Sequence, residues 1–226
     1  MSFSLLKNFS NITFFDVETT GVDYKRDEII EIAMLRSADD QGLLTVAEEF
    51  DALVKLSPGK TLHASITNLT GITGQQLLEE GLEKEEACEK LSDMLSRRET
   101  LLVAYNAQFD LCFIYSFLNS FGKARLLKGI KMLDMLTVYK DRKPYPHKLS
   151  DAALAYSLDN QSSHRAMGDT RMVFELFSKM AKESDDLERY VNLFGYNPKY
   201  GISGPKISSV RYMPQAFGAV KKLYEQ

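Results

Sequence analysis

ITFFDVETTG, residues 12–21, combines an apolar strand with two acidic side chains and ends in a polar turn. The aromatic and β-branched residues of 13–17 are typical of a buried strand, which Asp16 interrupts. Since side chains alternate along a strand, Asp16 and Glu18 project from the same face. Neighbouring carboxylates on a buried strand repel each other and lose hydration, and a divalent cation would offset both costs. The sequence therefore predicts a metal site at the end of a central strand.

Two segments with helical periodicity each place an aspartate on their apolar face. Asp110 heads the stripe of a helix expected to end near residue 121, and Asp169 heads that of a helix over 164–182. The helix dipole stabilises such an acid by only about 0.3–1 kcal/mol, too little to explain a core-facing aspartate. Four clustered carboxylates suit Mg²⁺ or Mn²⁺ and could hold two ions for displacement at phosphorus. His164, five residues before Asp169, is a candidate proton acceptor.

The remaining periodicity predicts an α/β domain with a mixed sheet. Strands over 28–36 and 45–54 would continue the first strand as an antiparallel meander, and further strands are expected at 100–105 and 131–136. Other helices are expected over 63–69, 83–98 and 149–156. Residues 137–148 read as a basic loop, and regular structure is not expected between 195 and 217.

The composition is ordinary for a globular protein, with 226 residues of which 44% are hydrophobic and 26% charged. No apolar run approaches the ~20 residues of a membrane span, and the N-terminus does not resemble a signal peptide. We therefore expect no membrane association. Cys88 and Cys112 show neither disulfide nor zinc-site spacing, so we expect a reducing, cytoplasmic environment. The net charge of −3 disfavours nucleic acid, but residues 121–150 carry eight Lys or Arg against two acids. That segment is either a phosphate-backbone contact or ordinary solvated surface.

Three motifs in order carry a resemblance to a known family: FFDVETTG at 14–21, LVAYNAQFD at 102–110 and HRAMGDT at 164–170. They resemble the motifs of the DEDDh-type 3′→5′ exonucleases (DnaQ-like), which include the proofreading subunit of bacterial DNA polymerase III and RNase T. The resemblance covers about residues 12–180. It implies a ribonuclease H-like fold with a mixed five-stranded sheet flanked by helices. The exonuclease domain would span 1–185, and 186–226 would be a C-terminal extension packed on or beside it.

The resemblance also implies roles for individual residues. Four would bind two divalent cations, Mg²⁺ or Mn²⁺: Asp16, Glu18, Asp110 and Asp169. His164 would be the general base that accepts a proton from the attacking water. Many relatives have histidine where this chain has Thr70 and Tyr105, which are not metal ligands, so these departures concern contacts to the end nucleotide. Five residues would contact that nucleotide: Thr19, Thr20, Leu69, Asn106 and Phe109.

The implied activity is 3′→5′ hydrolysis of single-stranded nucleic acid with release of nucleoside 5′-monophosphates. DNA is favoured as the substrate and RNA is the alternative. The sequence does not decide between them, because discrimination at the 2′-OH depends on pocket shape. A DNA polymerase is an alternative partner, and the chain would be either a proofreading subunit or a stand-alone enzyme. Two other hypotheses are a non-catalytic binding module, which the intact acid and histidine set disfavours, and a glycosidase-type carboxylate pair, which needs fewer acids. Residues 197–201 and 211–212 would either stack on a single strand or cover the core.

Overall fold

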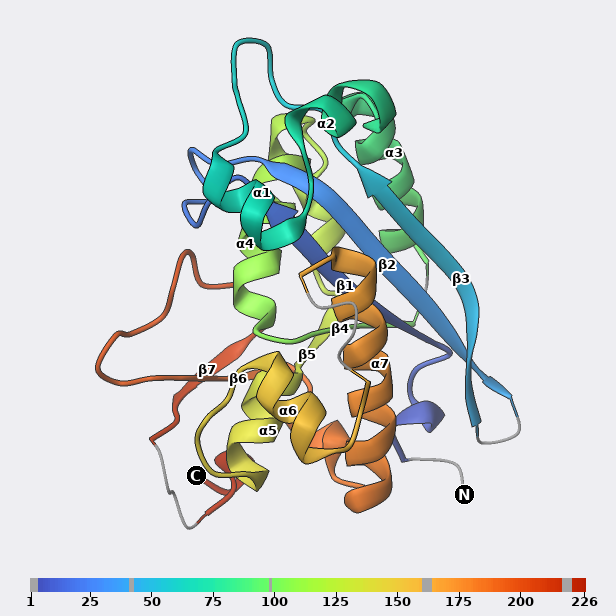
Figure 1. Cartoon of the computed structure of the whole chain (residues 1–226). Coiled ribbons are helices and arrows are strands. Elements are labelled where there is room, and N and C mark those ends of the chain that lie inside the picture. The colour runs from blue at the N-terminus through green and yellow to red at the C-terminus, as the bar shows by residue number, and fades with distance from the viewer. Residues whose placement is uncertain (1–3, 41–42, 98, 160–163, 217–220) are drawn as a thin grey trace.

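A five-stranded mixed sheet forms the centre of the protein in a computed structural model, which describes residues 4–40, 43–97, 99–159, 164–216 and 221–226. The strand order is β3-β2-β1-β4-β5 (Figure 1). The strands are β1 (Asn11–Thr19), β2 (Ile29–Asp40), β3 (Leu43–Leu53), β4 (Thr100–Ala104) and β5 (Lys131–Asp134). β2 pairs antiparallel with β1 and β3, whereas β4 pairs parallel with β1 and β5. The predicted mixed sheet with an N-terminal meander is therefore confirmed.

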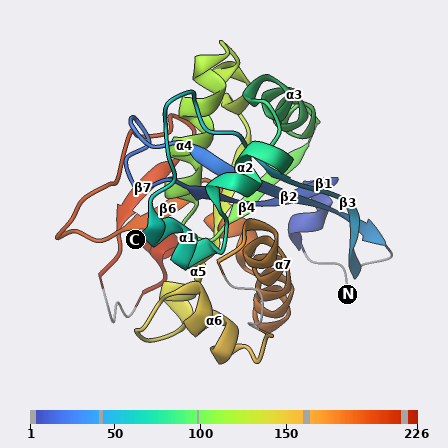
Figure 2. The ribbon, with the colours of Figure 1, turned by 45° about the horizontal axis from the view of Figure 1, so that its top comes forward.

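Helices cover both faces of the sheet. Figure 2 shows α3 and α4 above it and α6 and α7 below it. The helices are α1 (Ala64–Thr70), α2 (Gly74–Glu80), α3 (Lys84–Leu95), α4 (Ala107–Ser120), α5 (Met135–Arg142), α6 (Leu149–Ala155) and α7 (Ala166–Glu183). Within the described ranges, none of them is both long and apolar enough to cross a bilayer.

Alternation along β1 decides which side chains reach which layer. Phe14 packs edge-to-face on Phe174 and Phe177 of α7, with ring centroids 5.3 and 5.4 Å apart. Phe15 points the other way, into the cluster beneath α3 and α4. The acids two and four positions after Phe14, Asp16 and Glu18, consequently emerge on the α7 side of the sheet.

The prediction of a strand to residue 136 followed by a loop is wrong. β5 ends at Asp134, and α5 (Met135–Arg142) begins at once. Asp134 is the N-cap of α5, because its carboxylate accepts a hydrogen bond from the Leu136 N–H, and basic residues in the last turn complement the helix dipole. The apolar run of 132–136 hides this boundary, since a buried strand and a buried helix start look alike in composition.

The prediction that residues 195–217 lack regular structure is wrong in part, although 197–210 contain no helix or strand. β6 (Leu193–Tyr196) and β7 (Arg211–Pro214) form a parallel pair beside β5 (Figure 1). A parallel pair needs a long connection and carries no hairpin signal, so the local sequence does not reveal it. Residues after 186 enter both central clusters, with Tyr190 and Leu223 on the α7 side and Phe194 on the α4 side. The domain boundary at residue 185 stays a prediction.

Asp134 joins two helices to the edge of the sheet. Its Oδ1 accepts hydrogen bonds from the N–H groups of Asn106 and Ala107, at 2.9 and 3.2 Å, at the start of α4. Its Oδ2 accepts from the Thr137 hydroxyl at 2.7 Å. One buried carboxylate therefore sets the position of the first turns of α4 and α5.

Glu28 anchors the connection between β1 and β2. Its carboxylate accepts from the Ser57 N–H at 2.9 Å and pairs with Lys60 and Lys84 at 3.0 and 2.7 Å. Thr20 closes the same loop through backbone and hydroxyl hydrogen bonds to the main chain of Glu28. The turn that follows the acidic strand end is thereby tied to the loop before α1 and to α3.

The substitution Asp134→Ala should lower the free energy of unfolding by about 2–3 kcal/mol, because several buried donors lose their acceptor. Asp134→Asn keeps one carbonyl oxygen for Asn106 and Ala107 and should cost less than half as much. Urea unfolding at pH 7 measures both values. Equal losses for the two variants would contradict the capping role.

Burial alone would raise the pKa of Glu28, but hydrogen bonds from Lys84, the Ser57 N–H and Lys60 outweigh it and lower the pKa to about 2. Since the folded pKa lies below the unfolded one, this stabilisation is complete above about pH 4.5 and is lost as the pH falls toward 2. Glu28→Gln should therefore cost about 1–2 kcal/mol at pH 7 and clearly less at pH 3. Chemical unfolding at both pH values tests this, with the exposed Glu89→Gln as a control. A pH-independent loss in Glu28→Gln would refute the assignment.

Candidate active site

Three carboxylates meet where the end of β1 lies beside the start of α7. One oxygen from each of Asp16, Glu18 and Asp169 lies within 4.8 Å of the others. β1 supplies the first two from alternate positions, and the first turn of α7 supplies the third. The side chains are partly buried, so the group opens to solvent on one side. Oxygens at this spacing can close on one hard cation after small side-chain adjustments.

Asp110, from α4, contacts the backbone of β1 near the same three acids. It is in the first turn of α4, is 3% exposed, and accepts a hydrogen bond from the Val17 N–H at 3.2 Å through Oδ1. β4 ends at Ala104, and the last paired residue of β1 on that side is Phe14. The Val17 N–H therefore has no partner in β4 and donates its hydrogen bond to the Asp110 side chain instead. The structure places Asp110 beside Asp16 and Glu18, whose charges interact with it, but outside the group of three oxygens.

Burial and mutual repulsion disfavour ionisation of these acids. Burial, and then the charges of Asp110, Asp169 and Glu18, raise the pKa of Asp16 well above its ordinary value. Burial and the charges of Asp169 and Glu31 raise the pKa of Glu18 to about 7. The pKa of Asp169 is also raised, chiefly by burial. A divalent cation would reverse this by giving each carboxylate an opposite charge.

The donor set fits a hard divalent cation. Asp169 Oδ1 is buried and has no hydrogen-bond partner among the residues that the structure describes. An unpaired carboxylate oxygen inside a protein is costly unless a ligand completes it. All the available donors are carboxylate oxygens, which suit Mg²⁺ or Mn²⁺ better than softer metals.

Glu31 fixes the start of α7, a role that the sequence predictions did not assign to it. It is 1% exposed, faces Glu18 across β1 and β2, and accepts hydrogen bonds from the Arg165 guanidinium and the Ala166 N–H, the latter at 2.8 Å. The Arg165 charge also lowers the pKa of Glu18. A lone acid within the apolar run 29–35 was the available signal.

His164 lies just before α7. Its backbone is left-handed, with φ of 69°, and its N–H donates a hydrogen bond to the Asp169 carboxylate. The side chain is exposed and lines the same pocket as Asp169. An imidazole and a carboxylate of the acidic group therefore line the same cavity.

That pocket has a volume of about 420 Å³ and lies between the start of α4, α6 and α7. The residues that line it are Tyr105, Asn106, Leu136, His147, Lys148, Leu149, Ser150, His164, Asp169 and Met172. Tyr105 donates its hydroxyl to the His147 carbonyl at 2.9 Å and so joins two segments of the lining. The size suits a small organic ligand, with polar groups at its edge.

Of the five residues predicted to contact the end nucleotide, Asn106 lines this pocket, whereas the other four are not among its lining residues in the described chain. The Thr19 hydroxyl donates to the Gly21 carbonyl at 2.6 Å, and the Thr20 hydroxyl donates to Asp27 at 3.2 Å. Leu69 is 52% exposed on α1, and Phe109 packs on Phe113 with ring centroids 5.0 Å apart. Thr70 lies at the end of α1. Its hydroxyl donates a hydrogen bond to the Ile66 carbonyl and accepts one from the Ile72 N–H.

Comparisons with known proteins bear on this site. Residues 13–177 match the exonuclease family of the RNase T type. The chain is 32% identical over 174 residues to the DNA polymerase III subunit epsilon of Treponema pallidum, covering 74% of this chain and 75% of that one. It is 29% identical over 175 residues to the PolC-type DNA polymerase III of Staphylococcus haemolyticus, covering 76% of this chain but only 11% of that protein.

The fold resembles that of exonuclease I. The zinc-bound complex of the Escherichia coli enzyme with single-stranded DNA has a TM-score of 0.72 at 18% identity, covering 80% of this chain and 42% of that one. Its complex with a dT13 oligonucleotide has a TM-score of 0.68 at 20% identity, covering 76% and 41%. This likeness confirms the ribonuclease H-like fold. With the match over residues 13–177 and the epsilon-subunit relative, it follows that the chain belongs to the RNase T (DnaQ-like) family of DEDDh exonucleases.

Proposed function

We propose that the protein hydrolyses phosphodiester bonds at the 3′ end of single-stranded nucleic acid, with DNA preferred, and releases nucleoside 5′-monophosphates. The observation that carries the proposal is the meeting of Asp16, Glu18 and Asp169 beside a pocket that His164 also lines. Family membership supports exonuclease chemistry. The exonuclease I complexes with single-stranded DNA support this class of substrate.

Asp16, Glu18, Asp110 and Asp169 would hold two divalent cations, Mg²⁺ or Mn²⁺. When bound, such ions lower the pKa of the attacking water and stabilise charge on the phosphoryl and leaving oxygens. Asp16 and Glu18 come from one rigid strand, and the Val17 N–H orients Asp110. Asp169 is oriented by the His164 N–H and retains an unpaired oxygen for a ligand. The protein thus supplies carboxylate ligands that are already close together on packed elements.

His164 would accept the proton of the attacking water. Glu31 holds the next two residues, Arg165 and Ala166, so the main chain at the start of α7 is fixed. The exposed imidazole remains able to turn toward water at the pocket edge. Proton transfer by a positioned histidine accelerates such reactions by about 10²–10⁴-fold.

The terminal nucleotide would occupy the 420 Å³ pocket. Asn106 lines it with a left-handed backbone that Asp134 fixes, and Lys148, also in the lining, offers a cation for phosphate. RNA is the alternative substrate, and a DNA polymerase is the alternative partner, which the epsilon-subunit and PolC-type relatives support. A matched digestion of DNA and RNA strands of equal sequence separates the two substrates.

In a nuclease assay, 5′-labelled single-stranded DNA with Mg²⁺ should shorten progressively from its 3′ end, and 3′-labelled DNA should release labelled mononucleotide first. Asp16→Asn and Asp169→Asn should each lower kcat/KM about 1,000-fold or more, because each removes a ligand needed in the transition state. His164→Ala should lower it about 10²–10⁴-fold.

Asp93→Asn is the matched control for that assay, since it makes the same chemical change at an exposed position of α3 and should leave activity unchanged. If the wild-type protein digests neither DNA nor RNA above the level of Asp16→Asn, the proposal is contradicted and a non-catalytic binding module is favoured. Shortening from the 5′ end would contradict the assigned 3′→5′ polarity.

Without divalent cations, the acidic group should destabilise the protein as the pH rises. The folded pKa of Glu18 is raised from 4.5 to about 7, so its contribution to stability is complete below about pH 4.5 and is lost as the pH rises through 7. Mg²⁺ or Mn²⁺ should therefore raise the Tm more at pH 8 than at pH 5. In EDTA at pH 8, Asp16→Asn should raise the Tm while abolishing the shift with metal. Differential scanning fluorimetry measures both effects, and an unaltered metal shift in Asp16→Asn would exclude this residue as a ligand.

A further inference from the structure

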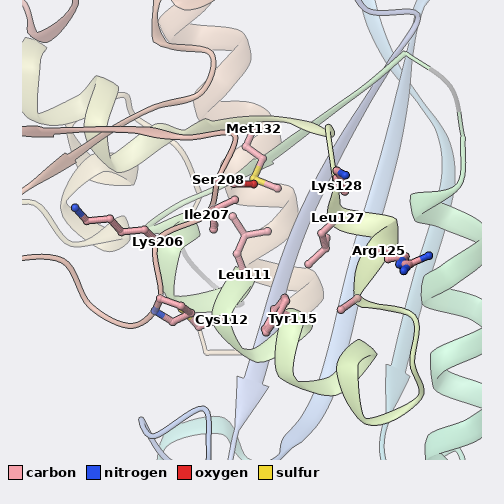
Figure 3. Close-up of a pocket in the computed structure, with 12 residues that line it drawn as sticks. Leu111, Cys112, Tyr115, Arg125, Leu127, Lys128, Met132, Lys206, Ile207 and Ser208 are labelled. Atoms are coloured by element: carbon pink, nitrogen blue, oxygen red, sulfur yellow. The ribbon is translucent and has the colours of Figure 1, made fainter.

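A second cavity, of about 410 Å³, lies on the α4 side of the sheet, away from α7 (Figure 3). Its inner surface is apolar, with Leu111 from α4, Leu127 from the chain leading into β5, Met132 from β5 itself, and Ile207 from the C-terminal segment. The first three belong to the hydrophobic cluster on that side and Ile207 packs against it, so the cavity reaches the core. Leu111, Leu127 and Met132 are buried at its floor, whereas Ile207 is partly exposed.

Hydrogen bonds hold the part of the C-terminal segment that lines the cavity in place against α4. The Gln108 side chain donates to the carbonyls of Ser203 and Pro205 at 2.7 and 2.9 Å, and it accepts from the Tyr212 hydroxyl at 2.6 Å. Gly204 has φ of 72°, and a Cβ there would lie 2.5 Å from the Cys112 sulfur, so only glycine allows this close approach to α4. The cavity is therefore preformed, which reduces the ordering cost of binding.

The rim carries positive charge only. Arg125, Lys128 and Lys206 are exposed around the opening, and in the described part of the chain none of them forms an ion pair. The cavity lining contains no acidic residue. The charge at this opening is opposite in sign to the net charge of the chain, −3. An occupant that combines an apolar anchor with carboxylates would complement both the walls and the rim.

We propose that this cavity docks an acidic peptide segment of a partner protein, with one large apolar side chain inserted beside Leu111 and Ile207 and carboxylates set against Lys128 and Lys206. A preformed apolar pocket within a polar rim is the usual form of such an anchor site. A single strand of nucleic acid fits less well, because grooves for single strands offer several aromatic side chains for stacking, and Tyr115 is the one aromatic residue in this lining.

The test uses fluorescence anisotropy with the end-blocked, labelled peptide EDLFDE and the full-length protein. The peptide should bind saturably, and the double variant Lys128→Glu/Lys206→Glu should weaken binding about 10-fold or more, since two attractions become repulsions. Lys90→Glu/Lys179→Glu, which alters the net charge equally at exposed positions outside the cavity, should change it little. Circular dichroism of both double variants should match the wild type.

Peptide variants test the apolar part without altering the protein. EDSSDE, which lacks the anchor, and KKLFKK, which reverses the charge, should both bind at least about 10-fold more weakly than EDLFDE. The proposal is overturned if EDLFDE does not bind, if EDSSDE binds equally well, or if both double variants lose the same affinity. It is also overturned if Lys128→Glu/Lys206→Glu weakens binding of a dT oligonucleotide but not of the peptide. Because no readout involves hydrolysis, the result is independent of the proposed nuclease activity.

Discussion

Repulsion among carboxylates at the end of β1 is the constraint on which the rest of the site depends. Asp16, Glu18 and Asp169 lie within reach of one another in a partly buried setting, and Asp110 adds a further charge beside them. Left alone, such a group would push β1, α4 and α7 apart. The surrounding structure opposes this separation by packing Phe14 against α7 and by bonding Asp110 to the Val17 N–H.

Two other buried acids, Glu31 and Asp134, stabilise the structure around the site. Each is more deeply buried than Asp16, yet each accepts several hydrogen bonds from backbone N–H groups and side-chain donors. Glu31 holds the start of α7, and Asp134 holds the start of α4, which are the helices that carry Asp169 and Asp110. Acids with several hydrogen bonds thus position Asp110 and Asp169, for which fewer donors are found, and this contrast in hydrogen bonding, more than burial, separates structural carboxylates from candidate ligands.

The sequence predicted the parts that local rules govern. Alternation along β1 placed Asp16 and Glu18 on one face, and helical periodicity put Asp110 and Asp169 on buried faces. Contacts between distant residues could not be predicted in this way. The Glu31–Arg165 pair spans 134 positions, and β6 pairs with β7 across a long irregular connection. Nor does periodicity show how a side chain turns, so the hydrogen bond that draws Asp110 to Val17 becomes visible only in the folded protein.

A continuous relay of hydrogen bonds links the C-terminal segment to the helix that carries Asp110. The Gly195 N–H donates to the Thr137 hydroxyl at 2.9 Å, that hydroxyl donates to Asp134, and Asp134 accepts from Asn106 and Ala107. Elements that share such bonds tend to open and close together as one cooperative unit. We therefore expect the segment after residue 186, which is synthesised last, to open and close together with the first turn of α4. Until it docks, the emerging chain holds the acidic strand end without the full set of restraints on its neighbouring helix.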